Sequence, residues 1–140
     1  MKSFKYQKCA AGYLWFGNEI LLAKRINGTF ANHYTCPAGK IEDGEDILSG
    51  LIREIKEETN FKIKKKQLKL IDCYFLPDRR PPKKVFVFES LLPSNYYDFY
   101  FGENPEPHKH EDWMLYTRKE ALKLKLMPNL REYLLNIKLD

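Results

Sequence analysis

The chain has 140 residues, a length that fits one domain over 1–140, and 44% of them are hydrophobic, which is enough for a core and excludes a disordered protein. Its net charge of +5 predicts attraction to polyanions such as nucleotides, RNA or acidic lipids, without choosing among them. No apolar stretch approaches the roughly 20 residues that a membrane-spanning helix needs, so we expect no membrane partner.

Strands are expected where short apolar stretches are bounded by turn residues. In chain order they are 4–16, 19–25, 34–36, 68–76, 84–92 and 113–116. A tight turn at Gly17 and Asn18 joins the first two strands, and Pro37 ends the third because proline lacks the N–H that a sheet needs. The acid-rich stretch 37–46 is expected to form a structured loop, and 93–110 looks irregular.

Three helices follow from apolar periodicity and from capping residues. They are expected over 47–59, from Thr117 to about 126, and from Pro128 onward. The first carries its apolar residues at the spacing of one helix face, namely Leu48, Leu51, Ile52 and Ile55. Asp46 is its expected N-cap, and Asn60 its C-cap because asparagine tolerates the left-handed conformation. Early strands, a central helix and late helices predict an α/β fold of the α+β kind, with helices on both faces of a mixed sheet.

The three cysteines, Cys9, Cys36 and Cys73, lie far apart and include no CxxC pair. Each lies in an apolar stretch that is typical of a strand, so we expect buried free thiols rather than disulfides or a zinc site. Unpaired thiols favour a reducing compartment, and we expect a cytoplasmic protein. The oligomeric state is open between a monomer and a homodimer.

Three acids stand together on the first predicted helix. Glu54, Glu57 and Glu58 are at i, i+3 and i+4, so their carboxylates share one edge of the helix beside its apolar stripe. Like charges at this spacing repel each other by about 0.2–0.5 kcal/mol per pair, and a divalent cation relieves that repulsion. Mg²⁺ takes oxygen ligands and is commonly shared between one or two carboxylates and substrate phosphates. Taken alone, the triplet also fits a solvated helix face, so the surrounding pattern decides.

That pattern is a spaced set of residues within 37–61. It reads Gly39, five residues, Glu45, seven residues, and then Arg53-Glu54-Ile55-Lys56-Glu57-Glu58-Thr59-Asn60-Phe61. It resembles the Nudix box, G-x5-E-x7-R-E-U-x-E-E-x-G-U with U a bulky apolar residue, and departs from it only at Asn60, where the family has glycine. The resemblance implies a Nudix-type α/β/α sandwich around a mixed sheet. It also implies a phosphoanhydride hydrolase with Mg²⁺, or Mn²⁺ as a substitute, as its cofactor.

The resemblance assigns roles to the acids and to the loop before them. Glu57 and Glu58 are expected to ligate the metal directly, and Glu54 is either a further ligand or the base that acts on water. The backbone carbonyl of Ala38 is an additional ligand by the same resemblance. Gly39 keeps the loop small enough for that approach.

Four charged residues around the box have supporting roles. Arg53 points away from the acids on a helical projection, and by resemblance it pairs with Glu45 and braces the loop against the helix. This is a structural role with catalytic consequences. Lys40, which follows the loop, and Arg25 are expected to bind the substrate's phosphates, although each also fits an ordinary surface position.

Residues outside the box are candidates through a further resemblance to MutT-type members, which hydrolyse nucleoside triphosphates and take another metal ligand from a later loop. The acids that compete for this role are Glu103, Glu106, Glu111 and Asp112, with Glu106 and Glu111 ranked first. Arg79 and Asn129 match residues that approach the base in those enzymes. Their alternatives are a solvent-exposed loop and a helix start.

Two further positions are noted for their chemistry. His108 and His110 are spaced to place two imidazoles on one side of a strand, but no third ligand at a sensible spacing is visible, so zinc is not expected. Trp113 fits stacking on a base, and it fits a core position at least as well.

The leading expectation is hydrolysis of a nucleoside triphosphate or another nucleoside-diphosphate-linked substrate by attack of water on phosphorus, most simply (d)NTP to (d)NMP and pyrophosphate. A second interpretation is removal of the cap or terminal phosphates from an RNA 5′ end. The lysine-rich run 62–69 suits it, although that run more readily marks a solvated turn. A third is a non-catalytic Nudix domain that senses a nucleotide, and the intact acids argue against it.

Overall fold

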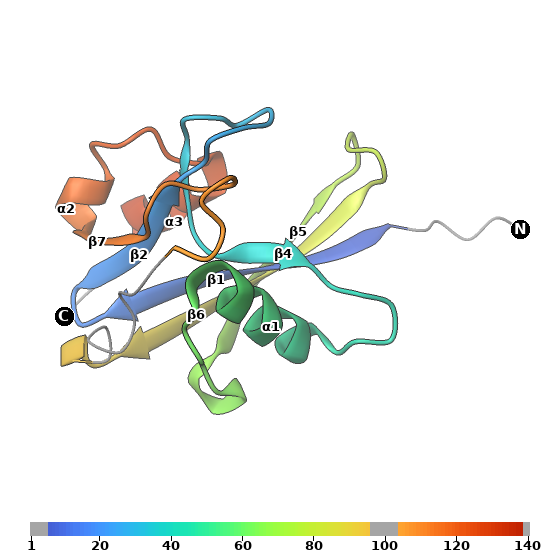
Figure 1. The fold of residues 1–140 in the computed structure, drawn as a ribbon, viewed down its shortest axis with the longest axis horizontal. Coiled ribbons are helices and arrows are strands. Elements are labelled where there is room, and N and C mark those ends of the chain that lie inside the picture. The colour runs from blue at the N-terminus through green and yellow to red at the C-terminus, as the bar shows by residue number, and fades with distance from the viewer. Residues whose placement is uncertain (1–5, 96–103, 139–140) are drawn as a thin grey trace, which may run out of the picture.

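The computed structural model describes residues 6–95 and 104–138, which form a mixed sheet with helices on both of its faces (Figure 1). The strands are β1 Gln7–Phe16, β2 Glu19–Lys24, β3 Tyr34–Thr35, β4 Ala38–Lys40, β5 Lys69–Leu76, β6 Lys83–Leu92 and β7 Met114–Thr117. The helices are α1 Ile47–Thr59, the short 3₁₀ turn η1 Lys65–Gln67, α2 Arg118–Ala121 and α3 Pro128–Asn136. The predicted α+β architecture around a mixed sheet is confirmed.

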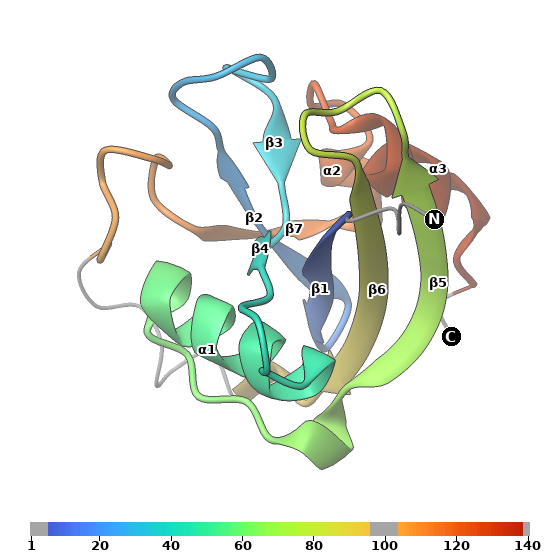
Figure 2. The ribbon, with the colours of Figure 1, turned by 90° about the vertical axis from the view of Figure 1, so that its right-hand side faces the viewer.

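Strand β1 is the centre of the sheet, whose order is β3-β2-β1-β6-β5 (Figure 2). It runs parallel to β6 over its whole length, from the pair Gln7 and Lys83 to the pair Phe16 and Leu92. On its other edge β1 pairs antiparallel with β4 near its start and with β2 near its end. The sheet is mixed because β2 returns through a tight turn, whereas β6 is reached only after a long crossover through α1 and β5.

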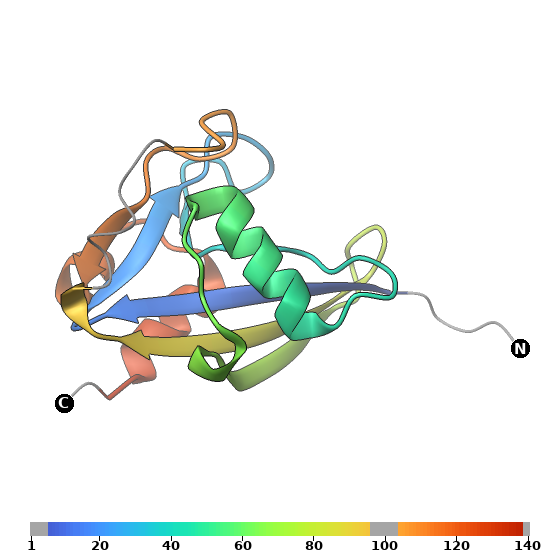
Figure 3. The same ribbon diagram turned by 60° about the horizontal axis from the view of Figure 1, so that its bottom comes forward.

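Side chains of β1 alternate between two hydrophobic cores, one on each face of the sheet, because successive residues of a strand point to opposite sides. The core under α1 includes Ala10, Leu14, Phe16, Leu51 and Ile55. The core under α3 includes Ala11, Tyr13, Trp15, Leu130 and Leu134. Helices α1 and α3 therefore cover opposite faces (Figure 3).

Helix α1 begins and ends at the residues that the sequence predicts. The Asp46 carboxylate accepts a 3.1 Å hydrogen bond from the N–H of Ser49, which satisfies one of the free donors of the first turn. At the other end Asn60 has a φ of 64°, in the left-handed region, and its N–H donates to the carbonyl of Lys56. Both caps are therefore confirmed.

The second helix is shorter than predicted, since α2 ends at Ala121 rather than near residue 126. Beyond it the N–H groups of Lys123 and Leu124 bond to carbonyls only three residues back. Lys125 then accepts a 2.7 Å hydrogen bond from the N–H of Tyr34 in β3. Pairing with a distant strand replaces the helix here.

The stretch after Pro37 also differs from the prediction, because Ala38–Lys40 is a strand, β4, rather than part of a loop. Of the three free thiols, Cys36 is buried, Cys9 is half-buried and Cys73 is exposed, so the expectation of a buried thiol is wrong for Cys73. Its strand, β5, lies at the edge of the sheet, and most of its residues are exposed. Among the described residues, none of the helices has the length and apolar character to cross a bilayer.

Candidate active site

The acid edge of α1 lies directly against β4. The N–H of Ala38 donates a 2.8 Å hydrogen bond to Oε1 of Glu58. A Cβ atom on Gly39 would come within 2.1 Å of Cδ of Glu54, so only glycine leaves room for that carboxylate. Local rules explain the arrangement, because helical spacing gathers the acids on one edge and the pairing of β4 with β1 carries the loop to that edge.

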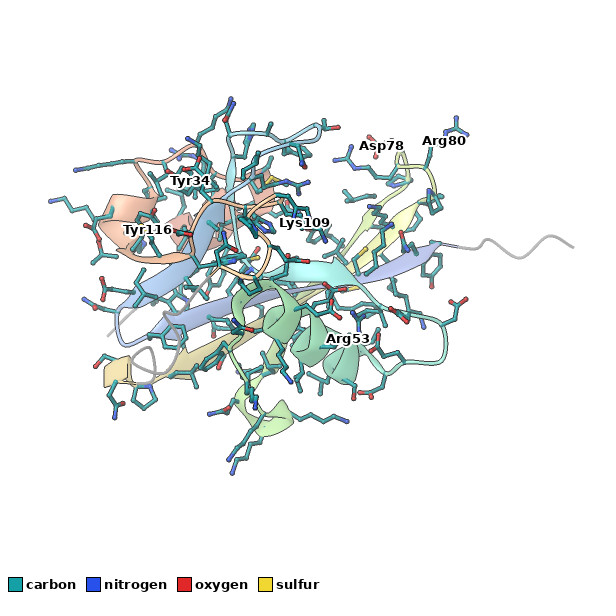
Figure 4. The ribbon with its side chains drawn as sticks, viewed as in Figure 1. Tyr34, Arg53, Asp78, Arg80, Lys109 and Tyr116 are labelled. Carbon is teal, nitrogen blue, oxygen red and sulfur yellow. The ribbon has the colours of Figure 1, made fainter. Side chains whose placement is uncertain are left out.

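Arg53 connects the acids to the loop before α1 (Figure 4). Its Nε and Nη2 atoms donate to both oxygens of Glu45, at 2.9 and 3.0 Å, and the guanidinium lowers the pKa of Glu45 to about 2. Nη2 also donates to the carbonyl of Lys40 at 3.0 Å. The predicted pairing with Glu45 is present.

The prediction that Arg53 points away from the acids is wrong. Its Nη1 atom donates to Glu54 at 3.0 Å and to Glu57 at 3.2 Å. A helical projection gives only the direction in which a side chain leaves the helix, whereas the long arginine side chain reaches Glu54 and Glu57 with its terminal nitrogen. Arg53 therefore holds two of the three predicted catalytic acids as well as the loop.

A cleft of about 910 Å³ begins at these acids and extends to the start of α3. Its acidic lining includes Glu54, Glu57 and Glu58. Its cationic lining includes Arg25, Lys40, Lys83 and Lys109. Its far part includes Tyr74, Met127, Asn129 and Leu130. The cleft thus presents carboxylates, cations and an aromatic side chain to one ligand.

The buried carboxylates lie in an environment that favours their neutral forms. Burial raises the pKa of Glu58 to about 8, and the nearby charge of Glu54 adds to the rise. Burial also raises the pKa of Glu54, although Arg53 opposes it. A divalent cation would offset both desolvation costs, because it attracts the ionised forms. The oxygen donors at this edge therefore fit a hard dication such as Mg²⁺.

The later loop brings two further groups to Glu58. Glu106 and His110 offer ligand atoms that lie, with one from Glu58, within 4.8 Å of one another. The indole Nε1 of Trp113 donates a 3.0 Å hydrogen bond to the carbonyl of Glu58, and the indole is buried, so it occupies a core position. Helical spacing and the Nudix pattern did not predict that His110 would reach the acids.

The other acids proposed for this loop lie elsewhere. Glu111 is exposed and forms an ion pair with Lys24 at 3.3 Å, and it does not belong to the group around Glu58. Glu103 lies outside the described residues. The structure therefore brings Glu106, and not Glu111, to the acid edge.

Only some of the predicted substrate-binding residues lie in the cleft. Arg25, Lys40 and Asn129 line the cleft, whereas the guanidinium of Arg79 lies 5.6 Å from the centre of the Phe30 ring and is not among the lining residues. Tip residues Asp78 and Arg80 of the same β5–β6 hairpin lie far from α1 (Figure 4). Among the lining side chains that the sequence did not predict are Tyr74, Lys83 and Lys109. The alternation of side chains along β5 and β6 indicates the face on which Tyr74 and Lys83 lie. Lys109 lies in a segment whose sequence shows no periodicity.

A comparison with protein-family models matches the NUDIX domain over residues 5–137. The chain belongs to the Nudix family. Two curated relatives are similar to this Nudix chain over part of its length. The ADP-ribose pyrophosphatase of Methanocaldococcus jannaschii is 44% identical over 75 residues, 54% of this chain and 43% of that protein. The asymmetrical bis(5′-nucleosyl)-tetraphosphatase of Caenorhabditis elegans is 32% identical over 101 residues, 66% of this chain and 64% of that protein. The chain thus spans less than two thirds of each relative.

Solved Nudix structures share the fold. The MutT NUDIX hydrolase of Burkholderia pseudomallei superposes with a TM-score of 0.77 at 19% identity, covering 96% of this chain and 99% of that one. The NUDIX domain of NrtR from Shewanella oneidensis, crystallised with ADP ribose, has a TM-score of 0.72 at 16% identity, covering 94% and 86%. The Ap4A hydrolase of C. elegans has a TM-score of 0.66 at 24% identity, covering 91% and 92%. At identities this low, the superpositions show a shared fold and nothing more.

Proposed function

We propose that this Nudix protein is a metal-dependent hydrolase that cleaves a phosphoanhydride bond in a nucleoside-diphosphate-linked substrate. The observation that supports the proposal most is that Glu54, Glu57 and Glu58 line one cleft together with five cationic side chains. Carboxylates attract the metal, and the cations attract the substrate's phosphates. The cleft volume of about 910 Å³ lies within the range of small-molecule sites, roughly 300–1,000 Å³.

In this proposal Glu57 and Glu58 hold Mg²⁺ with the carbonyl of Ala38 as a further ligand, and Glu54 is either another ligand or the base. The bound ion supplies stabilisation of the charge that develops on the phosphate oxygens. The Glu54 carboxylate lines the cleft at the same edge, where it could take a proton from the attacking water. Arg53 is a positioning residue, since its hydrogen bonds fix the Glu54 carboxylate.

The names of the two curated relatives point to substrates in which a nucleoside diphosphate is linked to a second group, namely ADP-ribose or a dinucleoside tetraphosphate. A (d)NTP, converted to (d)NMP and pyrophosphate, is the simplest alternative within the same chemistry. The far part of the cleft suits a nucleoside, because Tyr74 offers a ring for stacking and Asn129 offers an amide for the base.

An RNA 5′ end is the weaker candidate. The lysines of the run 62–69 are absent from the described residues that line the cleft, and Lys65 is paired with Asp46 at 3.5 Å. Binding through this run would depend steeply on salt, because it releases counterions from the nucleic acid. A strong preference for long 5′-triphosphate RNA over nucleotides, lost at high salt, would favour this candidate instead.

The proposal is tested by incubating the purified protein and Mg²⁺ with ADP-ribose, diadenosine tetraphosphate and several (d)NTPs, and separating the products by anion-exchange chromatography. We expect AMP from at least one linked substrate. Glu57→Gln should lower the rate about 100-fold or more, whereas Lys56→Gln, an exposed neighbour on the same helix, should leave it unchanged. No turnover of any substrate would favour a nucleotide sensor, and full activity of Glu57→Gln would remove Glu57 from the metal site.

A further inference from the structure

Away from the cleft, the sheet has a surface that none of the described helices covers, on the α1 side of β5, β6 and the start of β1. Figure 2 shows β5 and the adjoining part of β6 beside α1 rather than beneath it. We propose that this surface binds single-stranded nucleic acid, with aromatic rings for the bases and lysines for the phosphates. The proposal goes beyond the proposed function, because the residues of this surface do not line the cleft.

The pairing of the three strands determines which side chains share this surface. Residues directly opposite one another in a sheet point to the same side. Lys84 of β6 lies opposite Phe75 of β5 and opposite Lys8 of β1, so these three side chains form one row across the sheet. Phe86, two residues further along β6, points to the same side and packs against the core under α1. The row therefore lies on the α1 face.

Three aromatic rings gather around Lys84. Its Nζ atom lies 5.7 Å from the centre of the Tyr6 ring and 5.4 Å from the centre of the Phe86 ring. The rings of Tyr6 and Phe75 are 5.8 Å apart and meet at 84°. Tyr6 is 38% exposed and Phe75 is 49% exposed, so both offer ring surface to a ligand while their neighbours hold them in position. Unpaired bases stack on aromatic side chains whatever their sequence, because every base has a π face.

The charge of this surface is complementary to that of a polyanion. Lys8 and Lys84 belong to the aromatic row, and Lys8 is exposed. Within β1, β5 and β6 as the structure describes them, none of the side chains that point to the α1 face is acidic. A phosphate backbone therefore meets cations here without repulsion from the sheet.

The lysine-rich run 62–69 extends the surface at the other end of β5. Ile63 and Leu68 turn into the core under α1, and Lys64 and Lys66 between them stay exposed. Neither lysine has a carboxylate within ion-pair distance in the described part of the chain, whereas Lys65 is paired with Asp46. Strand β5 separates the run from the aromatic row by about 20 Å, at about 3.3 Å per residue. Cations thus lie at both ends of the surface, as a bound strand of several nucleotides requires.

An anionic membrane is the other partner that lysines beside apolar side chains can attract. An amphipathic membrane anchor buries its apolar face roughly 5–10 Å into the bilayer, so its apolar groups must project from the fold. Here Tyr6 and Phe75 lie on the sheet and are no more than half exposed, so they present ring surface without projecting. Unpaired bases, which can approach and stack, fit this geometry better than lipid chains do.

The test is fluorescence anisotropy with a labelled single-stranded RNA of about 12 nucleotides, a length within the site sizes of such surfaces. The RNA carries a 5′ hydroxyl and the buffer contains EDTA, so the probe has no phosphoanhydride bond and the acid edge has no metal. Phe75→Ala should weaken binding about 10-fold through loss of stacking and should leave nucleotide hydrolysis unchanged. Leu135→Ala, a matched change at an exposed apolar residue of α3 on the opposite face, should alter neither. Because Phe75 is half exposed, both variants are expected to fold.

The salt dependence of binding tests the lysines. For single strands, the logarithm of the binding constant falls with the logarithm of the salt concentration by about 0.7 for each phosphate contact. Replacing both Lys64 and Lys66 with Gln should therefore make the slope shallower by about 1.4. The same double change at Lys119 and Lys123, exposed lysines beside α2, alters the net charge equally and should leave the slope as it is.

Several results would overturn the proposal. One is no binding of the RNA at low salt, and another is an equal loss of binding in Phe75→Ala and Leu135→Ala. Displacement of the RNA by ADP-ribose would place it in the cleft instead. Equal affinity for a duplex of the same sequence would contradict stacking on the rings. Binding to vesicles of phosphatidylserine and phosphatidylcholine that depends on Phe75, without binding of RNA, would assign the surface to a membrane.

Discussion

The close approach of Gly39 to Glu54 allows the position of one carboxylate to be tested without removing it. In Gly39→Ala the new Cβ would lie 2.1 Å from Cδ and 2.3 Å from Oε2 of Glu54. Carbon atoms in contact are about 3.5–4.0 Å apart, so the carboxylate must move by about 1–2 Å. A displacement of about 1 Å at a catalytic group can cost about 100-fold in rate. We therefore expect kcat to fall about 100-fold.

Stability should change much less than activity in Gly39→Ala. The clash involves the flexible end of a glutamate, and the interaction lost is the partly exposed ion pair of Glu54 with Arg53, which is worth about 1 kcal/mol or less. Urea titration would measure this, together with steady-state rates on the best substrate of the panel. Gly44→Ala is the reverse control. Gly44 has a φ of 82° and open space around it, so alanine should cost about 1–2 kcal/mol of stability and leave kcat unchanged.

A double-mutant cycle completes the test. Glu54→Ala removes the side chain that the new methyl group displaces, so Gly39→Ala should have almost no further effect on kcat in that background. If Gly39→Ala retained kcat within threefold of wild type, or lowered it another 100-fold in the Glu54→Ala protein, the displacement of Glu54 would not be the cause.

Three other predictions follow from single side chains. Arg53→Lys should lower kcat by about 10–100-fold with little change in KM, because one lysine cannot hydrogen bond to Glu45 and Glu54 at the same time. Wild-type kinetics in this variant would contradict the positioning role. In the metal-free protein the folded-state pKa of Glu58 is about 8 against an ordinary value of 4.5. Protonated Glu58 therefore makes its full contribution to the free energy of unfolding below about pH 4.5. This contribution is lost as the pH rises through 8. Urea titrations at pH 5, 7 and 9 should show Glu58→Gln gaining a few kcal/mol over wild type with rising pH, and a constant difference would refute the shift. Asn60 has a φ of 64°, in the left-handed region that glycine adopts without strain. Asn60→Gly should therefore stabilise the protein by about 1 kcal/mol without changing activity, and Asn60→Ala should destabilise it by about the same amount. Urea midpoints would measure both changes.

The elements that the sequence predicted well are those set by neighbouring residues. Helix α1 has the bounds and caps expected from its apolar spacing, from Asp46 and from Asn60. Glu54, Glu57 and Glu58 lie along one edge because residues three and four apart share a side of any α-helix. The pairing of Arg53 with Glu45 was implied by the Nudix pattern, and the structure contains it.

What the sequence could not predict depends on residues far apart in the chain. α2 stops early because Lys125 pairs with Tyr34, 91 residues before it in the numbering, and β4 forms because β1 offers it an edge. Cys73 is exposed because it belongs to neither hydrophobic core, and an apolar strand pattern does not say which of its residues the rest of the chain will cover.

The candidate site shows the same contrast between features set by neighbouring residues and features set by residues far apart in the chain. One helix determines the acid edge, so local spacing alone locates it. The approach of Glu106 and His110 to Glu58 requires the later loop to be fixed by its own hydrogen bonds and by pairing beside β2, and no periodicity in the sequence carries that information. The amino-acid sequence by itself therefore determined the carboxylates and their spacing. Only the tertiary structure decided which distant side chains share their space, because such contacts follow from packing of the whole chain rather than from the geometry of one element.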